Sequence, residues 1–192
     1  MGASLDGYIA SPDGSYAWLE RATRSAKGDD FGMGKFFASI DTVIMGRKTW
    51  QVALKHGMNK TGFPKMKNYV FSRRLLPGTR HGVEFVAGDP HAFIARLKRQ
   101  PGKDIWLCGG GELAREFLKR GALDEVGMGI VPLLIGSGRP AFPPVFGEVQ
   151  LELVRNESHK AGIVVLVYKV VRSRRRPSMN RPKPSPKRKG GD

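Results

Sequence analysis

Two glycine-rich turns carry the residues best suited to chemistry in this sequence. Each follows a short apolar run, at residues 43–45 and 105–108, and each leads into a stretch of helical character. A strand that passes directly into a helix presents the unpaired N–H groups of the helix start, which bind phosphate. Two such turns in one domain predict a dinucleotide site. Its residues are Gly46, Arg47, Lys48 and Thr49 in the first turn, and Gly109, Gly110, Gly111, Glu112 and Leu113 in the second.

The side chains of these turns point to NADPH among the dinucleotides. Arg47 and Lys48 place two cations where the extra 2′-phosphate can bind, and arginine can bind it as a bidentate fork. The glycines at 109–111 let a pyrophosphate approach the main chain without meeting a Cβ atom. Their order is not the G-x-G-x-x-G pattern, so a Rossmann dehydrogenase is disfavoured. The alternative for each turn is an ordinary connection whose cations lie in solvent.

The elements that must position these turns alternate between strand and helix. Apolar runs bounded by turn residues predict strands at 43–45, 69–71, 84–86, 104–108, 126–134, 150–156 and 162–171. Helices are predicted at 29–40, 47–55, 89–99 and 112–119, the third with Asp89 as N-cap and Pro90 at its first position. This order predicts an α/β three-layer sandwich, with a mostly parallel sheet and an antiparallel edge made by the last two strands.

The charge of the chain divides it into two parts. The net charge is +16, from 33 Lys and Arg and 17 Asp and Glu residues. Residues 172–192 hold nine of these bases and one acid, so this segment and the rest of the chain carry +8 each. The segment has four prolines and one apolar side chain, Met179, which predicts a disordered tail after one domain at 1–171. Such a tail either binds nucleic acid weakly and nonspecifically by counterion release or has no defined partner.

Cysteine and histidine usage limits the class of protein. The single cysteine, Cys108, excludes an intramolecular disulfide and is typical of the reducing cytoplasm. One cysteine and four scattered histidines give no ligand spacing for zinc, so no metal is expected. The longest late apolar run, residues 161–168, is too short to span a bilayer. We therefore expect a cytoplasmic protein without a membrane segment.

Six segments in order resemble the landmarks of the dihydrofolate reductase-like superfamily. They are residues 4–10, 41–49, 70–73, 109–113, 123–125 and 132–140. Within it, residues 1–171 most resemble the branch represented by the C-terminal reductase domain of the bifunctional riboflavin deaminase-reductase and its stand-alone bacterial relatives. The resemblance implies NADPH-dependent hydride transfer to a heterocyclic or imine-type small molecule. The zinc deaminase motif of the bifunctional enzyme is absent, so no deaminase activity is expected.

The same resemblance ranks the substrates. It implies first the activity of 5-amino-6-(5-phosphoribosylamino)uracil reductase, in which a ribosylaminopyrimidine of riboflavin biosynthesis is reduced. Dihydrofolate is the second candidate. A rival function of another class is a non-catalytic nucleotide or nucleic-acid binder that uses the basic tail.

The resemblance also assigns roles to single residues. Thr49 and the amides around it meet phosphate, and Arg47 or Lys48 binds the 2′-phosphate. Ser72 and Arg73 form a second wall of the adenosine pocket. Asp6, with Ile9 and Ala10, lines the nicotinamide and is a candidate catalytic residue. Asp30 lies where the folate enzymes hold the carboxylate that pairs with the substrate and assists its protonation. The alternatives are a simple Asp-Gly turn at Asp6 and a helix-start carboxylate at Asp30.

The last strands predict a homodimer. Residues 163–168 are continuously apolar, so both faces of their strand need cover. Relatives among the riboflavin reductases pair as dimers, which agrees. The alternative is a monomer in which the loop at 136–144 and the helix at 89–99 cover this strand. Gly127 and Gly129 depart from the family pattern and should weaken the strand expected at 126–134, in which they lie.

Overall fold

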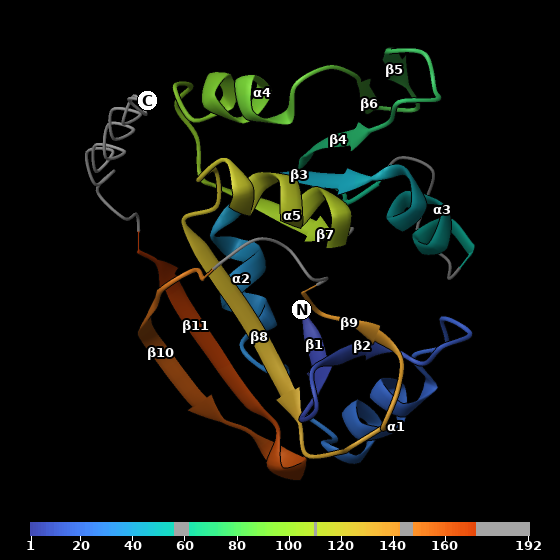
Figure 1. The fold of residues 1–192 in the computed structure, drawn as a ribbon, viewed down its shortest axis with the longest axis vertical. Helices are drawn as coiled ribbons and strands as arrows, with labels where there is room; N and C mark the ends of the chain where they lie inside the picture. The colour runs from blue at the N-terminus through green and yellow to red at the C-terminus, as the bar shows by residue number, and fades with distance from the viewer. Residues whose placement is uncertain (56–61, 110, 143–147, 172–192) are drawn as a thin grey trace, which may run out of the picture.

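The structure is a computed structural model, and it describes residues 1–55, 62–109, 111–142 and 148–171 (Figure 1). The expected tail at 172–192 and Gly110 lie outside the described residues. Mixed strands flanked by helices confirm the α/β class, with layers of helix, sheet and helix around the larger sheet. Among the described residues, no helix combines the length and apolar character that crossing a membrane requires.

The larger sheet has five strands in the order β5-β6-β4-β3-β7, and only the β5–β6 pair is antiparallel. Along β3, successive residues are buried on opposite faces. Ile44 packs with Phe71, Phe93 and Phe117 under α4 and α5, whereas Val43 and Met45 pack with Trp50 of α3. Both faces are therefore covered, as a parallel sheet requires. The elements are β3 (Ile40–Gly46), β4 (Lys67–Phe71), β5 (Gly78–Arg80), β6 (Val83–Val86), β7 (Asp104–Gly109), α3 (Arg47–Lys55), α4 (Pro90–Leu97) and α5 (Gly111–Lys119).

A second sheet of four strands, in the order β1-β8-β11-β10, holds the two ends of the domain. β1 is parallel to β8, and β11 is antiparallel to both β8 and β10. The helix α1 covers one side of it, where Trp18 packs against Val131 and Ile163. The elements are β1 (Gly2–Ser4), α1 (Ala17–Ser25), α2 (Met33–Ala38), β8 (Glu125–Val131), β10 (Leu151–Ser158), the 3-10 turn η1 (Lys160–Gly162) and β11 (Val164–Val170). β2 (Tyr8–Ala10) and β9 (Arg139–Pro140) form a separate antiparallel two-stranded sheet.

Most expected elements are confirmed within two residues of their ends. Two expected elements are corrected, and one helix was not expected. The helix expected at 29–40 begins only at Met33, because Phe31 and Gly32 have φ of 53° and 72° and cannot continue a helix. The strand expected at 126–134 ends at Val131, because Pro132 has no N–H for the ladder. The helix α1 was not expected at all, although Trp18 and Ala22 lie on one of its faces.

Candidate functional site

The two glycine turns meet at one edge of the larger sheet. β3 and β7 are parallel neighbours, and Met45 pairs with Gly109 in their register. β3 passes into α3 without an intervening residue, and α5 begins at Gly111, two residues after the end of β7. Both helices therefore start at the carboxyl edge of the sheet. Their free N–H groups and positive dipole ends form a site for anionic groups there.

Thr49 and Gly109 give this edge its close packing. A Cβ atom placed on Gly109 would lie 3.5 Å from Cγ2 and 3.7 Å from Oγ1 of Thr49, and Gly109 has φ of +144°. A Cβ atom on Gly46 would lie 4.0 Å from the carbonyl oxygen of Gly109. The absent side chains thus leave a backbone cradle beside the Thr49 hydroxyl. Backbone without Cβ atoms beside a hydroxyl is the kind of donor set that the expected cofactor requires, because phosphate must approach the main chain closely.

Cations line the same edge. Arg47 is half-buried, and its Nη1 donates to Oε1 of Gln51 at 2.8 Å, which holds the guanidinium at the helix start. Lys48 is exposed beside it. Phe71, the last residue of β4, pairs with Gly46, so the exposed Arg73 follows the neighbouring strand at this edge. The structure brings together the three cations that the sequence singled out.

Ser72 shapes the turn that carries Arg73. Its side chain is buried, and its Oγ accepts hydrogen bonds from the backbone N–H groups of Arg74 and Leu75 at 3.1 and 2.9 Å. Its own N–H donates to the carbonyl of Val86. The contacts of Ser72 are those of a residue that fixes the turn. Its expected role as a wall of the adenosine pocket stays a prediction.

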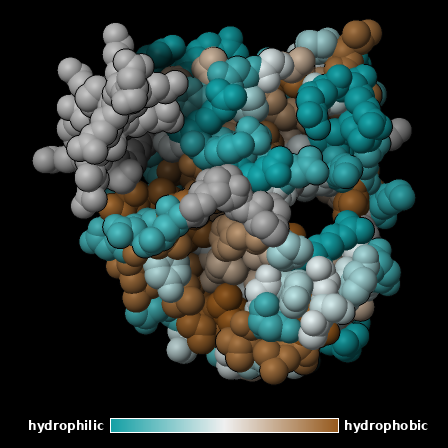
Figure 2. Space-filling model, viewed as in Figure 1, coloured by the Kyte–Doolittle hydropathy of each residue, from teal (hydrophilic) through white to brown (hydrophobic). Residues whose placement is uncertain are grey.

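Ile9 and Ala10 lie in β2, which faces this edge across an opening. Ala10 is buried and Ile9 half-buried, and β2 pairs with β9. Figure 2, in the same view as Figure 1, shows an opening between the surface over α3 and the surface over β2 and β9. The start of α3 and the two-stranded β2–β9 sheet therefore lie on two sides of one hollow. Glu112 is exposed and Leu113 half-buried in the first turn of α5.

The Asp6 carboxylate is occupied by structural contacts. It accepts from the N–H groups of Ile135 and Gly136, at 3.1 and 2.8 Å, and from the Ser4 hydroxyl. The Ser4 hydroxyl, followed by these backbone N–H groups, lowers the pKa of Asp6 from its ordinary value. Asp6 thus ties the first turn to the loop after β8 and stays ionised at neutral pH. These contacts favour the turn interpretation, and a catalytic role for Asp6 stays an untested prediction.

The Asp30 carboxylate caps α2. Its two oxygens accept from the N–H groups of Gly32 and Gly34 at 2.9 and 3.0 Å. The Gly34 N–H and then the Gly32 N–H lower the pKa of Asp30. An ionised carboxylate has no proton to donate, but each oxygen keeps a lone pair for a protonated nitrogen of a ligand. The arrangement suits an ionic partner of a substrate rather than an acid.

The single thiol lies in β7, one residue before the cradle. Burial raises the pKa of Cys108 to about 11, so the thiol is neutral at physiological pH. A neutral, buried thiol is a poor nucleophile. Cys108 therefore contributes packing, against the cluster of Val43, Met45 and Trp50.

Comparison with known proteins places the chain in a family. The sequence profile of the RibD C-terminal domain matches residues 1–165. The chain belongs to this family. The match covers both glycine turns, Asp6, Asp30 and the strands of both sheets except most of β11. The expectation drawn from the six sequence segments is confirmed.

Individual relatives are similar over most of the chain. YwjB of Bacillus subtilis (strain 168), an uncharacterized protein, is 37% identical over 156 residues, which are 80% of this chain and 86% of YwjB. A protein of Shewanella sp. PV-4 assigned to riboflavin biosynthesis has a crystal structure with a TM-score of 0.77 at 26% identity, covering 90% of this chain and 97% of that one.

A larger enzyme shares the fold. The diaminohydroxyphosphoribosylaminopyrimidine deaminase/5-amino-6-(5-phosphoribosylamino)uracil reductase of Thermotoga maritima aligns with a TM-score of 0.62 at 18% identity. The alignment covers 88% of this chain but only 55% of that protein. Family and fold together support a reductase-like role related to riboflavin biosynthesis.

Proposed function

We propose that the protein is an NADPH-dependent oxidoreductase that transfers a hydride to a small heterocyclic or imine-type substrate. The observation that carries the proposal is the convergence of α3 and α5 on the cradle of Gly46, Thr49 and Gly109, with Arg47, Lys48 and Arg73 along the same edge. Backbone N–H groups at two helix starts bind a pyrophosphate, and the cations beside them bind one further phosphate. NADPH has this arrangement of charge, and NADH lacks the last group.

The residues of the chain supply position and charge to this reaction. When bound, NADPH supplies the hydride from its nicotinamide ring. Ile9 and Ala10 offer an apolar strand on the other side of the hollow, which suits a flat ring and excludes water. The ionised Asp30 suits a substrate that carries a protonated nitrogen, because a cationic C=N bond accepts hydride more readily than a neutral one. Neither Asp6 nor Asp30 has a raised pKa that would make it an acid at neutral pH.

The substrate we propose first is 5-amino-6-(5-phosphoribosylamino)uracil, with dihydrofolate second. The T. maritima enzyme of the same fold is named for reduction of the first compound. Its open-chain form contains the imine that the proposed chemistry requires. Incubating the protein with each compound while NADPH absorbance is followed ranks them directly. Turnover of dihydrofolate alone, with loss of turnover in Asp30→Asn, would reverse the order.

The cofactor is tested by titrating NADPH and NADH into the wild-type protein and into Arg47→Ala. A hydrogen bond to a charged group contributes about 1.5–3 kcal/mol, so we expect NADPH affinity to fall roughly 10- to 100-fold in the variant. NADH affinity should stay unchanged, because NADH has no 2′-phosphate. Fluorescence of bound reduced nicotinamide provides the measurement.

Arg99→Ala is the matched control. Arg99 is exposed just beyond the end of α4, before β7 begins, and so lies at the opposite edge of the sheet from the cradle. Its loss should leave both affinities unchanged. Equal binding of NADPH and NADH by the wild-type protein, or equal losses in both variants, would contradict the proposal.

A further inference from the structure

A mostly buried histidine joins the last hairpin to the loop that precedes α2. His159 lies in the turn between β10 and β11, and its side chain is 12% exposed. Its Nδ1 lies 3.0 Å from Oδ1 of Asp29, whose side chain is 15% exposed. The two residues are 130 positions apart in the chain. None of the functional roles assigned above uses this pair.

The Asp29 carboxylate is the centre of the contact. It accepts from the N–H of Lys160 at 2.9 Å on Oδ2 and from the N–H of Phe31 at 2.9 Å on Oδ1. The Lys160 N–H, the Phe31 N–H and the His159 side chain together lower the pKa of Asp29. An ionised carboxylate only accepts hydrogen bonds, so Nδ1 of His159 carries the proton and donates it. The hydrogen bond between the two side chains therefore has a defined direction.

Apolar packing surrounds this contact. The Phe31 ring packs edge-on against the His159 ring, with centroids 5.6 Å apart. Phe31 also packs against the cluster of Trp18, Val131 and Ile163. Nε2 of His159 is buried and lies 3.6 Å from Oε2 of Glu157, beyond hydrogen-bond distance. The Nδ1 contact with Asp29 is thus the hydrogen bond that orients the imidazole.

The loop held by this contact has an unfavourable backbone. Phe31 has φ of 53°, a conformation that costs a bulky residue free energy. Ala161, in the facing turn, has φ of 57°. Asp30 lies between Asp29 and Phe31, and it caps α2 through Gly32 and Gly34. The Asp30 contacts are local, whereas the contacts of Asp29 with His159 and Lys160 tie this loop to a distant segment of the chain.

We propose that His159 is a positioning residue, which through Asp29 fixes the loop that carries Asp30 on the substrate side of the site. The substrate part of this inference rests on the proposed function. The loop part stands on the contacts themselves. The cofactor side lies on α3 and α5, with which His159 has no contact in the described structure, so NADPH binding should not depend on His159.

Amide hydrogen exchange in His159→Ala tests the loop. Loss of a hydrogen bond to a charged group should speed exchange at Phe31, Gly32 and Gly34 by about tenfold or more. Exchange in β3 and β4 should not change. In His159→Asn the amide N–H can take the place of Nδ1–H, so we expect slow exchange to return. His91→Ala, at an exposed histidine of α4, is the control. If His159→Ala does not fold, Asp29→Asn keeps the side-chain volume and tests the same contact.

Kinetics test the substrate side. The KM for 5-amino-6-(5-phosphoribosylamino)uracil should rise several-fold in His159→Ala, with NADPH affinity unchanged, and return in His159→Asn. Unchanged exchange at the three loop amides, or an equal increase in β3 and β4, overturns the positioning role. Fast loop exchange with an unchanged KM overturns its link to substrate. If the wild-type protein reduces no substrate, the proposed function fails, while the exchange measurement still decides whether His159 holds the loop.

Discussion

Gly109 and Gly129 show that one residue type serves opposite purposes at two positions. Gly109 has φ of +144°, which side-chain-bearing residues avoid, and it lies against Thr49 in the cradle. Gly129 lies inside β8 with an ordinary φ, and a Cβ atom there would meet nothing within 4 Å. The first glycine is required by its backbone, whereas the second weakens its strand.

This contrast predicts opposite effects of the same substitution. Gly109→Ala should destabilise the protein by about 1–3 kcal/mol because of backbone strain, and should weaken NADPH binding. Gly129→Ala should raise stability by about 0.5–1 kcal/mol and leave NADPH binding unchanged. Urea unfolding and NADPH titration of both variants provide the measurements. A stable Gly109→Ala protein with wild-type affinity would show that the cradle is not the phosphate site.

Four carboxylates predict how stability depends on pH. Hydrogen bonds lower the pKa values of Asp6, Asp29, Asp30 and Asp41 below the ordinary 3.8, through backbone N–H groups and, first in the case of Asp6, the Ser4 hydroxyl. A lowered folded-state pKa means that the unfolded chain takes up protons first as the pH falls. Their contribution to stability is therefore complete above about pH 4 to 5 and is lost as the pH falls through the folded values.

Urea midpoints between pH 7 and pH 2 check this dependence. We expect little change from these groups above pH 5 and a steep fall below pH 4. Asp6→Asn should make that fall shallower, because one of the four groups no longer titrates. A midpoint that falls mainly between pH 7 and pH 5 would assign the dependence to other groups.

The site residues that sequence could predict are those whose role is local. Gly46 ends a buried strand and Arg47 begins a helix directly after it, so a few neighbouring residues are enough to predict their place at the helix start. The partners of Asp6 and Asp29 are different, because Gly136 and His159 each lie 130 positions away. No local pattern marks such pairs. A positive φ at Phe31 likewise has no signal in its side chain.

Among the helices, the start of α4 is the one that the sequence predicts from its N-cap and proline. The Asp89 side chain accepts from the N–H of His91 at 3.0 Å, and Pro90 occupies the first position, as the sequence predicts. The helix expected at 29–40 has no proline at its first position, and Gly32 within that range takes a positive φ and forms a tight turn instead. The amphipathic residues of α1 were present but followed a Ser, Pro and Gly-rich stretch at 11–15, which concealed the start.

The cap of α4 can be measured on its own. Asp89→Ala should cost about 1 kcal/mol of stability, because the first turn of the helix loses its acceptor. Asp89→Asn keeps an acceptor oxygen and should cost much less. Chemical denaturation of the two variants separates the cap from the charge, since both lose the contact with Arg120 at 3.4 Å. Equal losses in both would assign the effect to that ion pair.

At the scale of the molecule, the four-stranded sheet has an apolar side over which no helix of the described residues lies. Leu151, Leu153 and Val154 of β10 are 42%, 49% and 57% exposed. Brown atoms gather over the lower parts of β8, β10 and β11 in Figure 2. The helix α4, one of the two covers that a monomer would need, packs on Phe71 in the larger sheet instead. This surface suits a second copy of the chain, in line with the expected homodimer.

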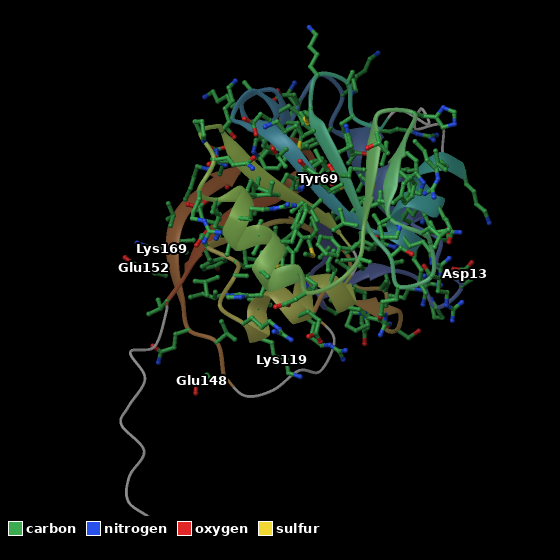
Figure 3. All side chains as sticks on the ribbon, turned by 90° about the horizontal axis from the view of Figure 1, so that it is seen from above. Asp13, Tyr69, Lys119, Glu148, Glu152 and Lys169 are labelled. Carbon is green, nitrogen blue, oxygen red and sulfur yellow. The ribbon has the colours of Figure 1, made fainter. Side chains whose placement is uncertain are left out.

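Light scattering at micromolar concentration and moderate salt tests the dimer. Leu153 pairs with Tyr168 and so lies on one face, whereas Glu152 pairs with Lys169 on the other, at the outer side of the molecule in Figure 3. We expect a dimer mass for the wild-type protein and for Glu152→Gln, and a monomer mass for Leu153→Glu. A monomer mass in the wild-type protein would remove the prediction.

The sequence predicted the helix and sheet layers of the fold better than it predicted how the strands divide into separate sheets. Strands that alternate with helices specify parallel pairing, and an apolar hairpin at the end specifies an antiparallel edge. Which strands lie in the centre depends on contacts between distant segments. β1 pairs with β8, and β8 with β11, so this sheet is assembled from both ends of the domain.

The pairing of β1 with β8 has a consequence for synthesis of the chain. Gly2 is synthesised before its partner Gly129, which follows more than a hundred residues later. At about 5–20 residues per second, the nascent first strand waits roughly 6–25 s for that partner. The larger sheet is complete once Gly109 has emerged, so it can serve as a folded platform during this interval. We therefore expect β1 to be synthesised before the strands of the larger sheet and to pair only after that sheet can form.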